Sequence, residues 1–181
     1  MSQLDGIGRV LLTTEQISER VREIGDRISA DYEGRQLVLV GILKGAFVFL
    51  ADLVRAVTIP VEVDFVAFSS YGASTTSSGV VRILKDLDES VEGKHVLIVE
   101  DIIDTGLTLK LSYMVENLKA RKVAGVRICT FLDKPSRRET DINPDYVGFV
   151  VPDEYVIGYG LDLNGMYRNL PFIAALGDGR K

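Results

Sequence analysis

Three carboxylates lie within five residues of one another, at Glu100, Asp101 and Asp104 of the segment VLIVEDIIDTGLTL. The residues that follow them at once are Thr105, Gly106, Leu107 and Thr108. If a helix begins there, its free backbone N–H groups, its dipole and two hydroxyls form a phosphate site, and the glycine lets the backbone approach the anion. The same short stretch therefore offers donors to an anion and carboxylates that repel it.

A phosphorylated sugar matches both kinds of group. If residues 95–99 (HVLIV) form a parallel strand, Glu100 and Asp101 lie at its carboxyl end, where open α/β sheets bind their ligands. The two side chains then point to opposite sides, because side chains alternate along a strand. The phosphate takes the backbone amides, while ribose hydroxyls or Mg²⁺, which prefers oxygen ligands, face the carboxylates.

Other interpretations of this stretch fit less well. A solvated acidic turn with a threonine helix cap does not require an apolar strand, an acid pair, a third acid and T-G-x-T in this order. The sequence contains no G-x-x-x-x-G-K-[ST], the ATP-binding P-loop, and no G-x-G-x-x-G after a strand, the dinucleotide-binding motif. We therefore predict a site for a phosphorylated sugar.

The surrounding pattern predicts strands that alternate with helices. Strand-like runs occur at residues 37–42, 61–68, 80–85, 95–99, 126–133 and 146–151. Helices are expected after the capping-box sequence TTEQ that begins at Thr13, over GAFVFLADLVRAV, and from Leu107, where apolar residues recur at helical spacing. This order predicts an α/β fold with a mostly parallel twisted sheet flanked by helices. The order of the strands does not follow from the pattern.

Two segments lack a regular period. Residues 69–79 (SSYGASTTSSG) are almost entirely polar, and long polar loops inside compact domains are often functional. Residues 152–172 mix glycines, prolines, tyrosines and charges, which predicts an irregular cap beside the sheet. We expect one domain over residues 1–181, with a core at 36–150 and a small irregular hood formed by the N-terminal segment and residues 151–176.

The composition excludes several other kinds of site. The chain has 181 residues, of which 46% are hydrophobic and 26% are charged, as is ordinary for a globular protein. Cys129 and His95 are its only cysteine and histidine, so an internal disulfide and a Cys/His zinc site are excluded. The net charge of −5 argues against nucleic-acid binding. No apolar run reaches the roughly 18 residues of a membrane span, and no signal peptide is recognised, so we expect a cytoplasmic protein.

At the residues quoted above, the sequence resembles the type I phosphoribosyltransferases, and within them the hypoxanthine(-guanine) members of the purine branch. The likeness includes LKGAFVFLADL, SSYG, LDKPSRR and PDEYVIGYGLDLNGMYRNLPF and extends from Gln36 to Leu176. It implies transfer of the 5-phosphoribosyl group of phosphoribosyl pyrophosphate (PRPP) to hypoxanthine and/or guanine, which gives IMP or GMP and pyrophosphate in purine salvage. It also implies Mg²⁺ as cofactor and a cytoplasmic homodimer or homotetramer with no nucleic-acid or membrane partner.

By this resemblance, different residues of the segment VLIVEDIIDTGLTL would contact the purine, the ribose and the 5′-phosphate. Asp104 would lie near the purine imidazole nitrogen as general base or as stabiliser of the protonated base, whereas an Asx turn is its structural alternative. Glu100 and Asp101 would hold the ribose hydroxyls, directly or through Mg²⁺. The 5′-phosphate would bind at residues 105–108, where Leu107 replaces a lysine of some relatives and leaves the phosphate to backbone amides and hydroxyls.

The pyrophosphate group of PRPP would be bound by residues from other parts of the chain. Lys44 and Gly45 match a loop that presents a backbone N–H to pyrophosphate in the family. Arg168 matches a further pyrophosphate contact, and Asp162 matches a second Mg²⁺ ligand. Without the resemblance, Asp162 and Arg168 would be interpreted as surface charges, and Lys44 could equally be a surface lysine that flanks a helix.

The purine would be bound by three residues of the second half of the chain. Lys134 matches a lysine that donates to the 6-oxo group, which favours hypoxanthine or guanine over adenine. Tyr155 stands where relatives stack an aromatic ring on the base, usually phenylalanine, and Val156 would offer its backbone to the base edge. Without the resemblance, Lys134 would be interpreted as a lysine at a strand end before Pro135, and the alternative for Tyr155 is an ordinary half-buried tyrosine. Glu154 is acidic where some relatives carry lysine.

The polar loop at residues 69–79 has a counterpart in relatives. Ser70 and Tyr71 open it, and in relatives it closes over the reacting centre. Closure would exclude water, which otherwise intercepts the activated sugar.

Two other functions remain open at this point. A regulator that senses PRPP would keep the fold without catalysis, but such proteins tend to add a DNA-binding domain or a basic RNA-binding face, and this chain is acidic. A transferase for xanthine, adenine or a pyrimidine is the other alternative, and Lys134 together with Tyr155 disfavours it.

Overall fold

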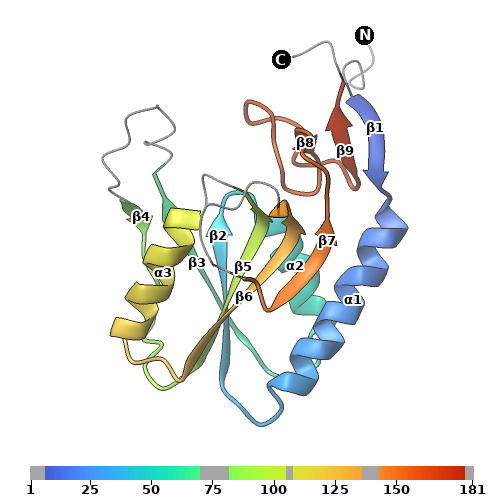
Figure 1. The fold of residues 1–181 in the computed structure, drawn as a ribbon. Helices are drawn as coiled ribbons and strands as arrows, with labels where there is room; N and C mark the ends of the chain where they lie inside the picture. The colour runs from blue at the N-terminus through green and yellow to red at the C-terminus, as the bar shows by residue number, and fades with distance from the viewer. Residues whose placement is uncertain (1–6, 70–81, 105–107, 136–142, 178–181) are drawn as a thin grey trace.

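The computed structural model describes residues 7–69, 82–104, 108–135 and 143–177, and its centre is a six-stranded sheet of order β4-β3-β2-β5-β6-β7 (Figure 1). The strands are β2 (Leu37–Leu43), β3 (Glu62–Phe68), β4 (Ile83–Lys85), β5 (His95–Ile103), β6 (Gly125–Asp133) and β7 (Tyr146–Val150). Only β4 is antiparallel to its neighbour, and the other pairs are parallel. The predicted mostly parallel sheet is therefore confirmed, and β5 lies in its middle.

Helices cover both faces of this sheet (Figure 1). The helices α1 (Thr14–Asp31) and α2 (Phe47–Ala56) share one hydrophobic cluster with Leu97 and Val99 of β5. The helix α3 (Thr108–Ala120) shares the cluster on the other face with Val96 and Ile98. The run HVLIV is thus buried on both sides, which is why it is continuously apolar. None of the helices in the described ranges has the length and apolarity needed to span a membrane.

The capping box predicted at Thr13 is confirmed. The Thr13 side chain accepts a hydrogen bond from the Gln16 amide at 3.3 Å, and the Gln16 side chain accepts one from the Thr13 amide at 2.9 Å. Both N–H groups precede the first intrahelical bonds and would otherwise lack a partner. The sequence TTEQ therefore fixes where α1 begins.

A second, smaller sheet was not predicted. It consists of β1 (Ile7–Leu12), β9 (Ile173–Leu176) and β8 (Val156–Ile157), which pair antiparallel in the order β1-β9-β8. In Figure 1 it lies beyond the ends of the strands of the large sheet, beside the expected ligand-binding edge. The cap expected to be irregular is therefore partly a sheet. Strands of two and four residues are too short to show a period of their own.

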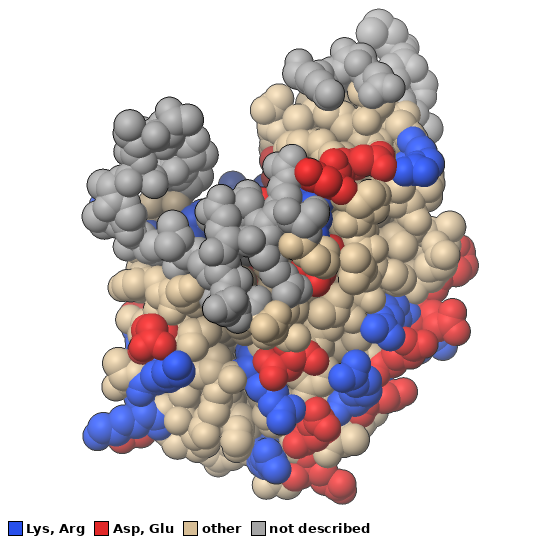
Figure 2. Space-filling view, in the orientation of Figure 1, with Lys and Arg blue, Asp and Glu red and all other residues tan. Residues whose placement is uncertain are grey.

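Acidic and basic side chains are interspersed over the face shown in Figure 2. Among the described residues, Arg20 forms an ion pair with Glu23 at 2.6 Å within α1, and Arg127 of β6 forms one with Asp31 at 3.0 Å. Exposed pairs of this kind contribute little to the free energy of unfolding. They do balance the charge of this surface.

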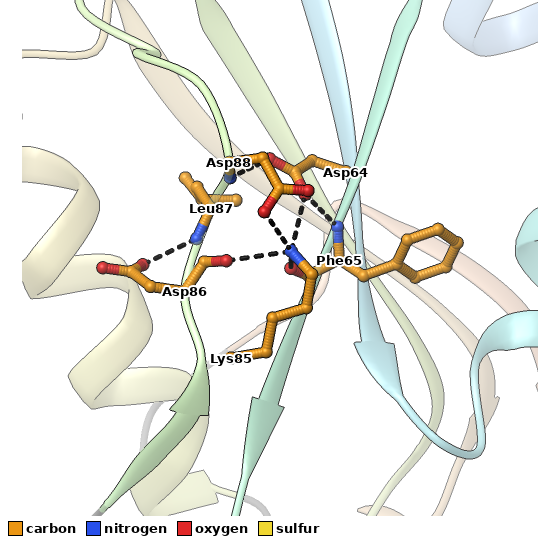
Figure 3. Close-up of polar contacts among 6 residues, drawn as sticks. All are labelled: Asp64, Phe65, Lys85, Asp86, Leu87 and Asp88. Carbon is orange, nitrogen blue, oxygen red and sulfur yellow. Dashed lines mark hydrogen bonds and ion pairs between the residues drawn. The ribbon is translucent and has the colours of Figure 1, made fainter.

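The edge strand β4 is held to β3 by a cluster of polar contacts around Asp64 (Figure 3). The Lys85 ammonium lies 3.1 Å from a carboxylate oxygen of Asp64 and 3.1 Å from one of Asp88. The amides of Phe65 and Asp88 donate to the Asp64 carboxylate at 2.6 and 2.8 Å. Burial alone would raise the pKa of Asp64, but these hydrogen bonds and the lysine outweigh it and lower that pKa below 3.8.

The lowered pKa makes Asp64 a source of stability that acid removes. The folded chain binds this proton more weakly than the unfolded chain, so the contribution is complete above the ordinary pKa of 3.8 and is lost as the pH falls through the folded value. We expect Asp64→Asn to lower the free energy of unfolding at about pH 7, and the difference from the unsubstituted protein to shrink towards about pH 3. Urea unfolding across this range measures both. Asp88→Asn, at a side chain that is 73% exposed, is the control with the smaller expected effect, and a difference independent of pH would contradict the prediction.

Candidate active site

Segments that are distant in sequence meet beside the carboxyl end of β5. A β-carbon placed on Gly45 would fall on the Asp101 carboxylate, and one placed on Gly160 would collide with the Gly45 carbonyl oxygen. The backbone at Gly45 is therefore enclosed between the acid of β5 and the turn at Gly160. The exposed Lys44 precedes it, and the peptide bond between Leu43 and Lys44 is cis.

Glu100 and Asp101 lie on opposite faces of the sheet, as the alternation along a strand predicts. Asp101 is directed to Gly45, on the side of α2. Glu100 continues the row of Val96 and Ile98, on the side of α3, and the Lys110 ammonium of α3 acts on its charge. The two acids thus have different neighbours although they are adjacent in sequence.

Both acids are buried, and burial is the largest influence on the pKa of each. Burial raises the pKa of Glu100 well above 4.5, the charge of Asp101 raises it further, and Lys110 offsets part of this. Burial raises the pKa of Asp101 to about 6, although the Ile102 amide, which donates to it at 2.8 Å, and the charge of Arg168 act in the opposite direction. Near neutral pH, a cation or hydroxyl donors beside these carboxylates would favour their charged forms.

One oxygen of Glu100 is an unsatisfied acceptor in the part of the chain that the structure describes. The residue is 2% exposed, and its Oε2 atom accepts no hydrogen bond there. A buried carboxylate oxygen without a donor is costly, so such an atom usually marks a place for a ligand or ion. Sugar hydroxyls and Mg²⁺ both meet this requirement.

The carboxylates also fit Mg²⁺ bound with substrate. Within the described ranges, no group of three or more acidic, histidine or cysteine side chains is arranged to hold a metal ion by itself. Mg²⁺ commonly takes only one or two carboxylates and completes its shell with water and substrate phosphates. Glu100, Asp101 and Asp162 can supply such oxygens, and the charge of Asp162 is close enough to raise the pKa of Asp101.

The turn at residues 158–160 contacts both Arg168 and the helix α2. Tyr159 has a φ of 46°, and its hydroxyl donates to the Asp52 carboxylate of α2 at 2.7 Å. Its ring packs against Phe131 with centroids 4.7 Å apart. Arg168 donates from Nη1 to the Gly160 carbonyl at 2.5 Å and forms an ion pair with Asp162. The guanidinium of Arg168 is thereby held near the Gly45 backbone, where the sequence predicted a pyrophosphate site.

The ends of β5 and β6 bring Asp104 and Lys134 together. Ile103 pairs with Asp133 in the parallel register, and the Lys134 amide donates to the Ile103 carbonyl at 3.2 Å. Asp104 is half-buried directly after this pair. Lys134 is 5% exposed, and its ammonium donates to the Glu154 carbonyl at 2.7 Å. A carboxylate and a buried cation thus flank the same edge of the sheet.

Tyr155, the aromatic residue expected to stack on the purine, is exposed. Tyr155 is 54% exposed, and its hydroxyl donates to the Asp162 carbonyl at 3.0 Å. Val156 is buried and pairs with Ala175 in the small sheet. An exposed flat ring next to a buried cation is an arrangement that suits a planar heterocycle.

Comparison with known proteins decides the family. Residues 10–164 match the model of the phosphoribosyl transferase domain. The chain belongs to the phosphoribosyltransferase family. Hypoxanthine-guanine phosphoribosyltransferase of Bacillus subtilis is 51% identical over 170 residues, which cover 94% of this chain and 93% of that relative. The crystal structure of a hypoxanthine phosphoribosyltransferase from Staphylococcus aureus has a TM-score of 0.90 and 48% identity and covers 95% of this chain and 92% of its own.

These relatives confirm the type I phosphoribosyltransferase fold and the resemblance to the hypoxanthine(-guanine) branch. The family region also occurs within longer proteins. The bifunctional protein TilS/HprT of Listeria monocytogenes serotype 4b is 50% identical over 97% of this chain, and the chain spans 27% of that relative's length.

Some residues predicted for the site lie outside the described residues. They are Ser70, Tyr71, Thr105, Gly106 and Leu107. Thr108 begins α3, as expected, but its side chain is also outside the description. The expected phosphate-binding turn and the opening of the polar loop therefore remain predictions.

Two residues of the candidate site were not predicted from the sequence. Asp133 ends β6 and is 3% exposed, so it adds a buried carboxylate next to Lys134. An acid that ends an apolar strand was the available signal, as it was for Glu100. Tyr159 was also missed, and its position between two glycines was the only local sign of a constrained turn.

Proposed function

We propose that this phosphoribosyltransferase transfers the 5-phosphoribosyl group of PRPP to hypoxanthine and/or guanine, giving IMP or GMP and pyrophosphate. The observation that carries the proposal is the shared edge of β5 and β6. There, Asp104 and the buried Lys134 lie beside two buried acids, Glu100 and Asp101. The Bacillus subtilis relative, which is a hypoxanthine-guanine phosphoribosyltransferase, supports the same reaction.

The reaction requires charge stabilisation at three points. A purine nitrogen forms a bond to C1 of the ribose, the bond from C1 to the pyrophosphate oxygen breaks, and the purine N–H proton passes to Asp104. Glu100 and Asp101 place negative charge near the ribose, where positive charge develops as the leaving group departs. Arg168 and the backbone at Gly45 face the departing pyrophosphate. Positioning and electrostatics therefore supply most of the acceleration.

Mg²⁺ is part of this proposal. Glu100, Asp101 and Asp162 would hold it together with oxygens of PRPP, which fits the unsatisfied oxygen of Glu100. When bound, the ion neutralises charge on the pyrophosphate.

Lys134 is the residue that we expect to select a 6-oxopurine. Its ammonium has three donors, of which one is directed to the Glu154 carbonyl. Another can donate to the 6-oxo group of hypoxanthine or guanine. The 6-amino group of adenine is itself a donor and would leave the N–H of the buried ammonium that faces the base without an acceptor, which is costly.

A panel of bases tests the function. PRPP-dependent release of pyrophosphate is measured with hypoxanthine, guanine, xanthine, adenine and uracil in parallel. We expect release with hypoxanthine, guanine or both, and little with adenine or uracil. Release only with adenine or uracil would contradict the role of Lys134, and no release with any base would favour a PRPP-sensing regulator.

We also propose that the chain forms a homodimer or homotetramer in the cytoplasm. A largely apolar groove of about 1460 Å³ lies between α1, α2 and residues 165–171, and Arg168 is among the residues that line it. Phe47 and Met166 on it are 43% and 56% exposed, as is typical of surfaces that a partner covers. The single cysteine, Cys129, is buried and suits a reducing compartment.

Sedimentation equilibrium tests the assembly. We expect the mass of two or four chains, and a shift towards one chain in Met166→Glu, which places a charge in the apolar groove. A monomeric unsubstituted protein would contradict the proposal.

A further inference from the structure

We propose that the Tyr155 hydroxyl couples the purine side of the site to the pyrophosphate side by anchoring the purine-stacking ring to the segment of Asp162 and Arg168. This inference rests on the proposed function, which supplies the two ligands. It concerns the phenolic hydroxyl of Tyr155, which is not needed for stacking on the purine because phenylalanine stacks equally well.

The backbone of Tyr155 is held from both sides. The preceding carbonyl, of Glu154, accepts from the Lys134 ammonium at 2.7 Å. The carbonyl of Tyr155 itself accepts from the Leu176 amide of β9 at 2.8 Å. The freedom that remains at this position is therefore that of the side chain.

The side chain is fixed by its hydroxyl more than by packing. The residue is 54% exposed, so the ring has few neighbours to restrict its rotamer. The hydroxyl donates to the Asp162 carbonyl at 3.0 Å, which ties the far end of the ring to a residue seven positions further along the chain. Ordering a free side chain on binding costs about 0.5–1.5 kcal/mol. A ring that is already anchored is ordered before the purine binds, so this cost does not weaken purine binding.

The anchor point belongs to the pyrophosphate side. The Asp162 carboxylate accepts from the Gly165 amide at 2.6 Å and forms an ion pair with Arg168. Arg168 donates in turn to the Gly160 carbonyl, and Gly160 packs against the Gly45 carbonyl oxygen. A continuous series of contacts thus joins the ring of Tyr155 to the backbone at Gly45.

This arrangement predicts that the two ligands assist each other. An anion bound by the Arg168 guanidinium adds a second anionic contact to that side chain, which holds Arg168 and its ion-pair partner Asp162 in one position. The carbonyl that accepts from Tyr155 moves with it, so pyrophosphate changes how firmly the ring is held. Coupling between two binding sites is reciprocal, so the purine must strengthen pyrophosphate binding by the same factor.

The test measures the dissociation constant of hypoxanthine by calorimetry, with and without saturating pyrophosphate and Mg²⁺. In the unsubstituted protein we expect pyrophosphate to tighten hypoxanthine binding. In Tyr155→Phe we expect hypoxanthine binding to weaken about 2- to 10-fold, and most of the tightening by pyrophosphate to be lost. In turnover, the same variant should raise the KM for hypoxanthine by a larger factor than it lowers kcat.

Tyr113→Phe is the matched control. It removes the hydroxyl of another exposed tyrosine, on α3, which is 41% exposed and has no part in the site. Neither the affinity for hypoxanthine nor its tightening by pyrophosphate should change in this variant. Equal tightening by pyrophosphate in Tyr155→Phe and in the unsubstituted protein would overturn the inference, as would an absence of tightening in the unsubstituted protein. The binding titrations do not require turnover, so a protein that binds both ligands without catalysis would refute the proposed function and still decide the coupling.

Discussion

Asp104→Asn is expected to lower kcat by about 10²–10⁴-fold, the usual contribution of a general base. Asparagine has nearly the same shape as aspartate but does not accept the proton that the purine releases. Asp104 lies directly after the pairing of Ile103 with Asp133, which holds the backbone that leads to it, so the substitution should leave the fold intact. Steady-state kinetics with saturating PRPP and hypoxanthine measure the loss, and thermal unfolding checks the fold.

The same variant separates the catalytic role from the structural alternative. Asparagine forms Asx turns as readily as aspartate, so a residue that only shapes the turn would tolerate the change. Asp26→Asn, at an exposed position of α1, is the control for loss of one negative charge. Unchanged turnover in Asp104→Asn would refute the assignment of Asp104 as the base.

Gly45→Ala is expected to have the second large effect, because the added methyl group has no space. Its carbon would fall on the Asp101 carboxylate, which is buried and already accepts from the Ile102 amide. Overpacking of this kind costs about 1–3 kcal/mol. If the cost falls on the arrangement that binds PRPP, the dissociation constant of PRPP rises about 5- to 150-fold. Calorimetry with PRPP and Mg²⁺ measures this directly.

Gly34→Ala provides the comparison. Gly34 has a φ of +71° and no atom near the position of an added β-carbon, so alanine there strains the backbone without touching the site. We expect this control to lose about 1–2 kcal/mol of stability and to keep its affinity for PRPP. Equal PRPP affinity in Gly45→Ala and in the unsubstituted protein would show that Asp101 can move without consequence.

The large sheet could be predicted from sequence because its signals are local. The run at residues 95–99 is apolar throughout because both faces of β5 are covered, and TTEQ contains both partners of the capping box. The strand order and the small sheet could not be predicted. Strand β1 is defined by its pairing with β9, at the other end of the chain, and not by a pattern of its own.

The residues of the site likewise include some that the sequence predicted and some that it did not. Glu100, Asp101 and Asp104 were found because one short segment carries them. The enclosure of Gly45 by Asp101 and Gly160 could not be foreseen, since it depends on how two distant turns pack. The anchoring of Tyr159 to Asp52 likewise has no trace in the local sequence, because the partners are 107 positions apart.

The pairing of β1 with β9 has a consequence for the order of folding. Ile7 pairs with Leu176, so this contact spans 169 positions, whereas Leu37 of β2 and His95 of β5 are 58 positions apart. Contacts between distant residues form late, because a longer loop must close first. The large sheet should therefore assemble before the small one. The small sheet, in which Leu176 also holds the backbone of Tyr155, is therefore completed only when both ends of the chain have come together.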